Sequence, residues 1–222
     1  MFIGHYAPAI TLATRKDAPP AWTLFIAAQF VDYLFFLAVF PGWERAPHDP
    51  TAPHALPFAL DAPFTHSLAG TALLAILFGG ALAAAAPKGR RAPWFWISAI
   101  TVLSHWFTDW LVHRPDLPLI PGSEPLGLGL WYHPLIAWPL EIGLLLAATY
   151  YFARTVPERA RTAWALALFL ILMQIVSRQM PPAERVTDTA PAALFAYTLF
   201  ALLAAWALRK PSSRRANLAQ DA

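Results

Sequence analysis

Three polar residues recur at helical spacing inside an otherwise apolar stretch of the chain. His105, Asp109 and His113 lie in WFWISAITVLSHWFTDWLVH at positions i, i+4 and i+8. In an α-helix this spacing places the three side chains on one face, one turn above the other. Imidazole and carboxylate groups are common ligands of divalent metal ions in proteins. The pattern therefore predicts a row of metal ligands along one helix.

Two further candidate ligands lie near the start of the chain. Asp32 interrupts the apolar run QFVDYLF, and His5 lies in FIGHYAPAITLAT, which is about 13 residues long. That N-terminal piece is too short to cross a bilayer, so we expect it to enter the helix bundle as a half-helix. At a rise of about 1.5 Å per residue, His5, Asp32 and His105 reach similar depths. These positions predict that the three side chains meet.

The segment that opens with Thr-His-Ser supplies another candidate ligand. His66 is expected one turn inside the helix that begins there, facing the same half of the bundle as Asp109. Asp61 lies two residues ahead of Pro63, as a helix N-cap followed by an early proline would. We therefore predict that Asp61 caps this helix and exclude it from the metal site.

The membrane makes buried carboxylates costly. Asp32, Asp109 and Glu141 fall within apolar segments, and each costs about 2.5 to 3.5 kcal/mol at the bilayer centre. A bound structural metal ion is worth about 10 to 16 kcal/mol, which is enough to offset them. Interhelical hydrogen bonds or a buried ion pair are the alternative for His105 and Asp109. Glu141 is expected either to meet backbone freed by Pro139 or to join the site.

Composition places the protein in the membrane. Of 222 residues 58% are hydrophobic, and the mean hydropathy is +0.46, which is more apolar surface than one soluble core of this size can bury. The chain contains no cysteine, so thiolate metal sites are excluded. We predict a single all-α membrane domain of about six transmembrane helices and a short N-terminal half-helix. The predicted spans are 21–40, 65–86, 94–112, 129–152, 162–179 and 191–208.

The chain is expected to divide by role along its length. Residues 1–152 carry the predicted metal-site helices, residues 153–209 two additional scaffold helices, and residues 210–222 a flexible basic tail. Loop by loop, the two termini and the even-numbered loops carry 12 Lys and Arg residues against 4 in the other loops. The positive-inside rule then predicts that both termini are cytoplasmic. The cations form short clusters between apolar runs, so no nucleic-acid partner is expected.

Several motifs together resemble a known family. Gly4-His5 near the start, Asp32, Thr65-His66-Ser67 and SHWFTD followed by a proline-rich turn resemble the membrane-bound metal-dependent hydrolases of bacterial inner membranes. That family is distantly similar to zinc-dependent phospholipase C. The resemblance covers about residues 1–140 and implies an inner-membrane location. It implies as metal ligands His5, Asp32, His66, His105 and Asp109.

The chain departs from this family in two places. Many members carry a D-x-D-H pattern where this chain has the single Asp32, and no His or Arg stands three or four residues ahead of His66. The motifs therefore leave the ligands of a second metal ion unassigned. His113 is a further candidate ligand from its spacing alone, although it can equally end its span at the membrane interface.

These observations predict a metal-dependent membrane hydrolase that acts on a phosphoester or lipid-linked substrate. The expected cofactor is a divalent metal ion, with Zn²⁺ ahead of Mn²⁺ and Fe²⁺. Asp109 or Asp32 would bridge two ions or act as the base, and Arg114 would neutralise an anionic group of the substrate. The expected partners are membrane lipids and a small-molecule or lipid substrate, whereas the oligomeric state is left undetermined.

Two other classes of function stay open. A transporter or channel would use the intramembrane His, Asp and Glu residues as a proton or metal-ion pathway, and predicts a polar line that reaches both membrane faces. A non-catalytic membrane scaffold would hold its metal ion in a closed shell of four ligands with no open position.

Overall fold

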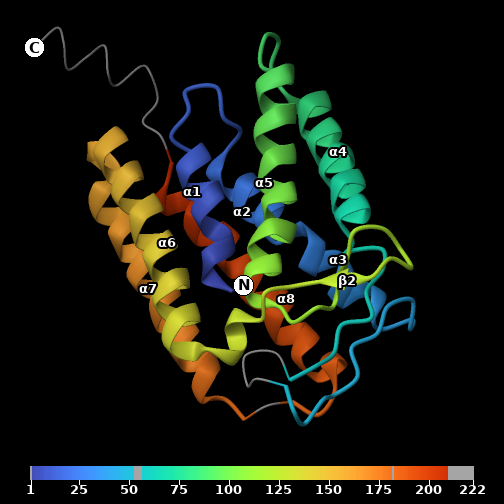
Figure 1. The fold of residues 1–222 in the computed structure, drawn as a ribbon. Coiled ribbons are helices and arrows are strands. Elements are labelled where there is room, and N and C mark those ends of the chain that lie inside the picture. The colour runs from blue at the N-terminus through green and yellow to red at the C-terminus, as the bar shows by residue number, and fades with distance from the viewer. Residues whose placement is uncertain (1, 53–56, 182, 210–222) are drawn as a thin grey trace, which may run out of the picture.

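The protein is almost entirely helical (Figure 1). The computed structural model describes residues 2–52, 57–181 and 183–209, so the predicted basic tail at 210–222 lies outside the described residues. A two-stranded antiparallel sheet joins β1 (Leu117–Pro118) to β2 (Pro125–Leu126). The helices are η1 (Ile3–His5), α1 (Tyr6–Leu12), α2 (Ala21–Ala28), α3 (Phe30–Ala38), α4 (Leu68–Ala85), α5 (Arg91–Val112), η2 (Leu130–Tyr132), α6 (Pro134–Thr155), η3 (Pro157–Arg159), α7 (Ala160–Gln179) and α8 (Val186–Ala207).

The helices confirm the predicted all-α membrane bundle. Four are long and apolar enough to cross a membrane: α4, α6, α7 extended back to Pro157, and α8. The pair α2 and α3 makes a fifth span if it is counted as one segment, although it is bent by 50° at Gln29. The predicted span 94–112 corresponds to the 22-residue α5, which does not meet the same test because its polar face lowers its hydropathy. Length and composition thus support four or five of the six predicted spans.

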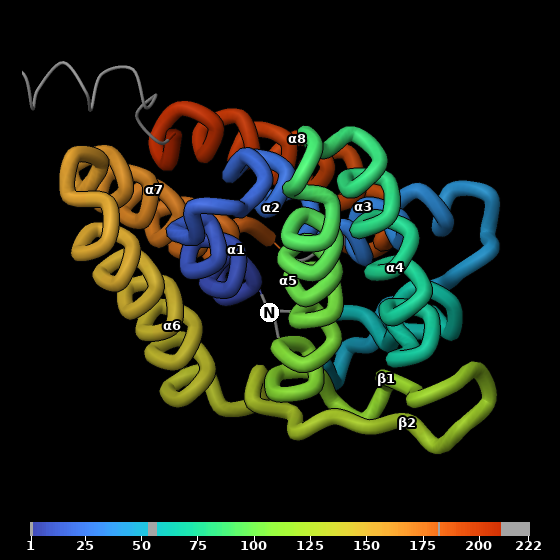
Figure 2. Tube along the Cα trace, turned by 90° about the horizontal axis from the view of Figure 1, so that it is seen from above, coloured from blue at the N-terminus to red at the C-terminus, as the bar shows by residue number. Residues whose placement is uncertain are grey.

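The helices form two groups on either side of the N-terminal arm. Helices α4 and α5 pack side by side, α6 and α7 form a second pair, and α1 and α2 lie between the two groups (Figures 1 and 2). Helix α8 packs along α2 and α7. The α1–α2, α4–α5 and α6–α7 connections lie at one end of the bundle (Figure 1). The basic segments that these connections carry are therefore gathered at that end.

The N-terminal half-helix is present and buried. Ile3, Tyr6 and Ile10 on η1 and α1 are at most 2% exposed. The arm is held by its backbone, since the Phe2 N–H donates to Glu141 Oε2 at 2.8 Å. Glu141 also accepts a hydrogen bond from Trp131 Nε1 at 3.1 Å. Glu141 therefore anchors the arm.

The start of α4 differs from the predicted one. Ser67 is the N-cap, and its hydroxyl accepts a hydrogen bond from the Gly70 N–H at 3.0 Å. The predicted cap Asp61 instead pairs through its backbone with Arg45 in an isolated β-bridge. The prediction was wrong because a cap must lie within three residues of the N–H groups it satisfies. His66 consequently precedes the helix.

Candidate metal centre

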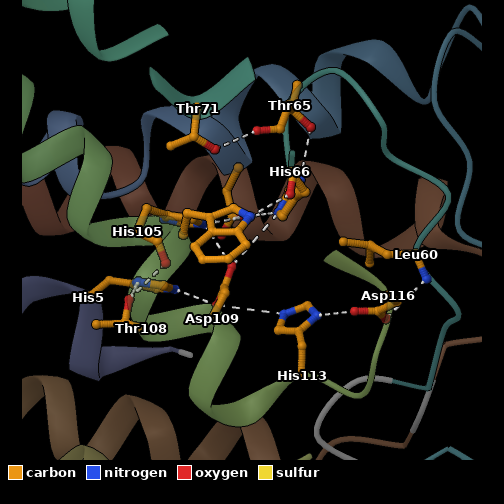
Figure 3. A network of polar contacts seen from close by, with 12 residues as sticks. His5, Leu60, Thr65, His66, Thr71, His105, Thr108, Asp109, His113 and Asp116 are labelled. Carbon is orange, nitrogen blue, oxygen red and sulfur yellow. Dashed lines mark hydrogen bonds and ion pairs between the residues drawn. The ribbon is translucent and has the colours of Figure 1, made fainter. Parts of the chain in front are cut away.

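Four imidazoles surround the carboxylate of Asp109 (Figure 3). Its Oδ1 lies 3.1 Å from His5 Nε2 and 3.6 Å from His113 Nε2. Its Oδ2 lies 3.0 Å from His105 Nε2 and 4.0 Å from His66 Nε2. All five side chains are buried. His105 and Asp109 on α5 and His113, which follows the last residue of that helix, thus lie on one side as their spacing predicts. Their role as metal ligands stays a prediction.

A second carboxylate extends the same cluster. Asp32, in the first turn of α3, places Oδ1 3.3 Å from His66 Nε2 and 3.5 Å from His105 Nε2. His105 therefore lies between both carboxylates. Two groups of three residues bring their ligand atoms within 4.8 Å of one another: His5, His105 and Asp109, and Asp32, His66 and His105. We call the full set the His/Asp cluster, which consists of His5, Asp32, His66, His105, Asp109 and His113.

The ring orientation of His105 is fixed by a backbone carbonyl. His105 Nδ1 lies 2.8 Å from the carbonyl oxygen of Ala28, the last residue of α2. A carbonyl oxygen at a helix C-terminus lacks an intrahelical partner, and it can only accept. The Nδ1 atom therefore carries the proton, and the break at Gln29 supplies the acceptor that holds the ring.

Threonine hydroxyls fix two further rings in the same way. Thr65 Oγ1 donates to Glu44 Oε2 at 2.6 Å and so accepts from His66 Nδ1 at 2.9 Å. Thr108 Oγ1 donates to backbone carbonyls of its own helix and so accepts from His5 Nδ1 at 2.6 Å. In both rings Nδ1 again carries the proton.

The fourth ring completes a common pattern. His113 Nδ1 donates to Asp116 Oδ1 at 3.0 Å. Every imidazole of the cluster thus donates its Nδ1–H to an acceptor outside the cluster and directs its Nε2 toward the carboxylates. Hydrogen bonds of this kind to the second ring nitrogen are typical of metal-bound histidines, because they set the tautomer that leaves Nε2 free to coordinate.

Every protonation state of the four histidines leaves a conflict in the cluster, either between facing acceptors or between like charges. In the neutral tautomer each Nε2 is an acceptor, and it faces a carboxylate oxygen that is also an acceptor. Charging every ring would place like charges together, since the rings of His5 and His105 stack with centroids 3.9 Å apart. Moreover, His105 Nε2 is buried and makes no hydrogen bond to any described residue. A cation shared by the Nε2 atoms and the carboxylates removes both conflicts.

The spacing of the cluster also fits a metal ion. Ligands about 2.0 to 2.2 Å from Zn²⁺ in a tetrahedral site stand about 3.3 to 3.6 Å from one another. The separations of 3.0 to 3.6 Å between the Nε2 and Oδ atoms are close to these values. The donor set of nitrogen and oxygen suits Zn²⁺, Mn²⁺ or Fe²⁺.

The cluster faces a cavity of about 310 Å³, which is within the size range of ligand sites. Asp32, His66, Asp109 and His113 line one part of it. The remaining wall is mainly apolar and includes Phe35, Phe36, Phe58, Leu60, Trp131 and Val186. The cluster therefore has an open side that a small molecule can approach.

The structure does not bring Arg114 to this cavity. Its guanidinium donates to Asp49 Oδ2 and to the Phe58 carbonyl oxygen, so it ties the loop after α3 to the end of α5. This contact, together with hydrogen bonds from Thr51, lowers the pKa of the Asp49 carboxyl below its usual range. The cation among the described residues that line the cavity is Arg178 instead.

Several supporting residues were missed at the sequence level. Thr65 and Thr108 each stand between a phenylalanine and a ligand, in Phe-Thr-His and Phe-Thr-Asp, and this repeated pattern was a usable signal. Asp116 stands three residues after His113, which was a weaker one. Tyr197 on α8 donates to Asp32 Oδ2 at 2.9 Å. Nothing in the sequence around Tyr197 distinguishes it from an interfacial tyrosine.

The chain matches a known family. A family model described as YdjM inner membrane protein matches residues 63–181, or 119 of the 222 residues. The matched part holds His66, His105, Asp109 and His113. No curated protein and no solved structure matches the chain.

Proposed function

The chain belongs to the YdjM inner membrane protein family, and for this bacterial inner membrane protein we propose metal-dependent hydrolysis of a phosphoester or lipid-linked substrate. The observation that carries the proposal is the common orientation of four imidazoles, each bonded through Nδ1 and turned inward through Nε2. Such a set, gathered on two carboxylates, is a ligand shell for one or two divalent ions. Zn²⁺ is the first candidate, followed by Mn²⁺ and Fe²⁺.

The chemistry divides between the ion and the protein. A divalent ion bound here would lower the pKa of a bound water and polarise a phosphoryl or acyl oxygen. Asp109, in contact with the imidazoles from three separate segments, holds the ligand set together. Asp32 lines the cavity with its side chain 17% exposed. This position lets Asp32 accept a proton from an attacking water or bridge two ions.

The cavity favours an enzyme over the two alternatives. A closed structural site would have no open position, whereas this cluster lines a cavity. A conduction path would need polar groups through to the other end of the bundle. There, a fully buried apolar core formed by Ile10, Phe25, Phe152 and Phe200 occupies the interior among the described residues. The gathering of the basic connections at that same end, where α8 also ends (Figure 1), supports a cytoplasmic position for that end and for the C-terminal end of α8. The N-terminal arm instead begins inside the bundle, where Phe2 lines the cavity.

Metal content and hydrolysis test this proposal together. The purified protein is loaded with Zn²⁺, dialysed and analysed by elemental mass spectrometry, alongside His105→Gln and the exposed His133→Gln as a matched control. We expect stoichiometric metal in the wild type and in His133→Gln, and a loss in His105→Gln. The loaded proteins are then given dioctanoyl phosphatidic acid and 4-nitrophenyl acetate, which separate phosphoryl from acyl chemistry.

Phosphate release that follows metal content across the three proteins would support the proposal. A wild-type protein that retains no metal would refute the metal site. A fully loaded protein that hydrolyses neither compound would favour the scaffold alternative.

A further inference from the structure

The cavity carries a cation away from the His/Asp cluster. Arg178, in the last turn of α7, is the only Lys or Arg among the described residues that line the cavity. Its guanidinium carbon lies 5.9 Å from the ring centroid of Trp131, which also lines the cavity. A cation over an indole face is held in place by the ring quadrupole. The guanidinium is therefore positioned within the wall of the cavity.

Arg178 keeps hydrogen-bonding capacity unused. Its Nε is buried and has no hydrogen-bond partner among the described residues. The Glu141 carboxylate attracts it electrostatically, but Glu141 is engaged by Phe2 N and Trp131 Nε1. Within the described part of the chain, no carboxylate lies within 4.0 Å of Arg178. A half-buried arginine whose Nε lacks such a partner is suited to receive a carboxylate or phosphate in bidentate fashion.

Apart from Arg178 and the His/Asp cluster, the wall of the cavity is mainly apolar, and exposed apolar side chains lie beside it. Phe35, Phe36 and Val186 line the cavity. Leu37 on α3 and Phe40 two residues beyond its end are 54% and 55% exposed. Met180 lines the cavity and is itself 59% exposed. In an inner membrane protein, apolar side chains that are exposed on the helices or just beyond their ends, as Phe40 is after α3 and Met180 after α7, meet lipid. A molecule with an apolar chain therefore meets compatible surface both outside and inside the cavity.

We propose that Arg178 binds the anionic group of an amphiphilic phosphate ester whose chain lies along the apolar wall, and so selects the substrate of the His/Asp cluster. This inference rests on the proposed hydrolase function for the reaction that the ester undergoes after it has bound. The recognition step itself requires only Arg178 and the cavity wall. The ester is either a lipid or a soluble phosphate compound with an apolar group, and the two sources differ in chain length.

Binding of simple probes to the reconstituted protein tests the role of Arg178. The full chain is placed in phosphatidylcholine nanodiscs, and the dissociation constants of dodecyl phosphate, inorganic phosphate and dodecanol are measured by calorimetry. The proteins compared are wild type, Arg178→Gln, Arg178→Lys and Arg154→Gln, an exposed arginine at the other end of the bundle. Each is measured with Zn²⁺ and after chelator treatment, and its melting temperature is recorded.

We expect Arg178→Gln to weaken dodecyl phosphate binding by about 10- to 100-fold, the range of a lost charge-assisted hydrogen bond. Dodecanol binding should not change, Arg178→Lys should lose less, and Arg154→Gln should match the wild type. If Arg178 served only the end of α7, its substitution would lower the melting temperature without changing the ratio of dodecyl phosphate to dodecanol affinity.

Each outcome decides one part of the inference. Equal affinity of wild type and Arg178→Gln for dodecyl phosphate would overturn it. Inorganic phosphate that binds as tightly as dodecyl phosphate would overturn the role of the apolar chain and leave Arg178 as a site for phosphate alone. A protein that retains no metal ion but still binds dodecyl phosphate through Arg178 would refute the hydrolase and leave this inference standing.

Discussion

The two carboxylates of the His/Asp cluster have unlike surroundings. Asp109 is 3% exposed and lies within 4.0 Å of four imidazoles. Asp32 is 17% exposed, lies near two imidazoles, and receives a hydrogen bond from the Tyr197 hydroxyl. Both carboxylates line the cavity, but the enclosed Asp109 is placed to organise a metal ion, whereas the more exposed Asp32 is better placed to meet water and substrate. From this difference we propose that Asp109 assembles the metal site and that Asp32 takes part in the reaction.

The largest expected effect comes from exchanging each carboxylate for its amide. Asp109→Asn should lower Zn²⁺ affinity by more than the roughly 100-fold that outer-shell partners are worth, because it removes the charge that faces four Nε2 atoms. Asp32→Asn should lower it by only about 10-fold. Competition with a chromogenic chelator measures both, with Asp188→Asn, at a surface ion pair with Arg185, as control. Equal losses in the two variants would remove the distinction between the carboxylates.

The two threonines that accept hydrogen bonds from histidine Nδ1 atoms provide the next test, and one lies on each side of the cluster. Thr108→Val removes the acceptor for His5 Nδ1, beside Asp109, and Thr65→Val removes that for His66 Nδ1, beside Asp32. Each should lower Zn²⁺ affinity by about 10- to 100-fold. Thr149→Val is a matched control, because this buried hydroxyl only bonds a carbonyl of its own helix. A control that loses as much affinity would show a packing effect.

A smaller effect on metal binding is expected from Tyr197→Phe. It removes one hydrogen bond to Asp32, which is worth about 1.5 to 3 kcal/mol when the acceptor is charged. Because we expect Asp32 to contribute less to metal binding than Asp109, most of this loss should appear in the rate of hydrolysis. Steady-state kinetics at saturating Zn²⁺ measure it, with Tyr33→Phe, whose hydroxyl contacts Thr198, as control. An unchanged rate would argue against a reactive role for Asp32.

The smallest effect is expected at the loop beside the cavity. The pKa of Asp49 is lowered in the folded protein by the contact with Arg114. The pair therefore stabilises the fold above the ordinary carboxyl pKa of 3.8, and this contribution is lost as the pH falls below it. Asp49→Asn should lower the melting temperature slightly at neutral pH. The difference from wild type should shrink in acid, and a difference that grows in acid would contradict the assignment.

The residues of the His/Asp cluster were predictable from sequence, whereas most of the residues that support them were not. His105, Asp109 and His113 repeat at helical spacing in an apolar segment, so the cost of placing them in lipid already indicated partners. His5 was found because its segment was too short to cross. Tyr197 and Arg178 come from helices expected to serve as scaffold. Their approach to the cluster depends on how α7 and α8 pack, and no local pattern records that packing.

The number of membrane spans also could not be predicted from hydropathy alone. Hydropathy measures how well a helix suits lipid on all sides, but α5 carries its polar face toward the protein interior. Nine of its residues are buried, and His105 and Asp109 are among them. An average over the helix thus understates its fitness for a membrane interior. Mean hydropathy is therefore a poor guide to a span, such as α5, that carries buried polar side chains.

The contact between His105 and the carbonyl of Ala28 has a practical consequence for mutagenesis. The acceptor belongs to the main chain at the end of α2, so no side-chain substitution at position 28 deletes it. An alanine scan would not detect this support, because the residue at position 28 is already alanine. Only a change that restores a continuous helix through Gln29, or an amide-to-ester replacement that weakens the carbonyl as an acceptor, would reveal what the bend contributes.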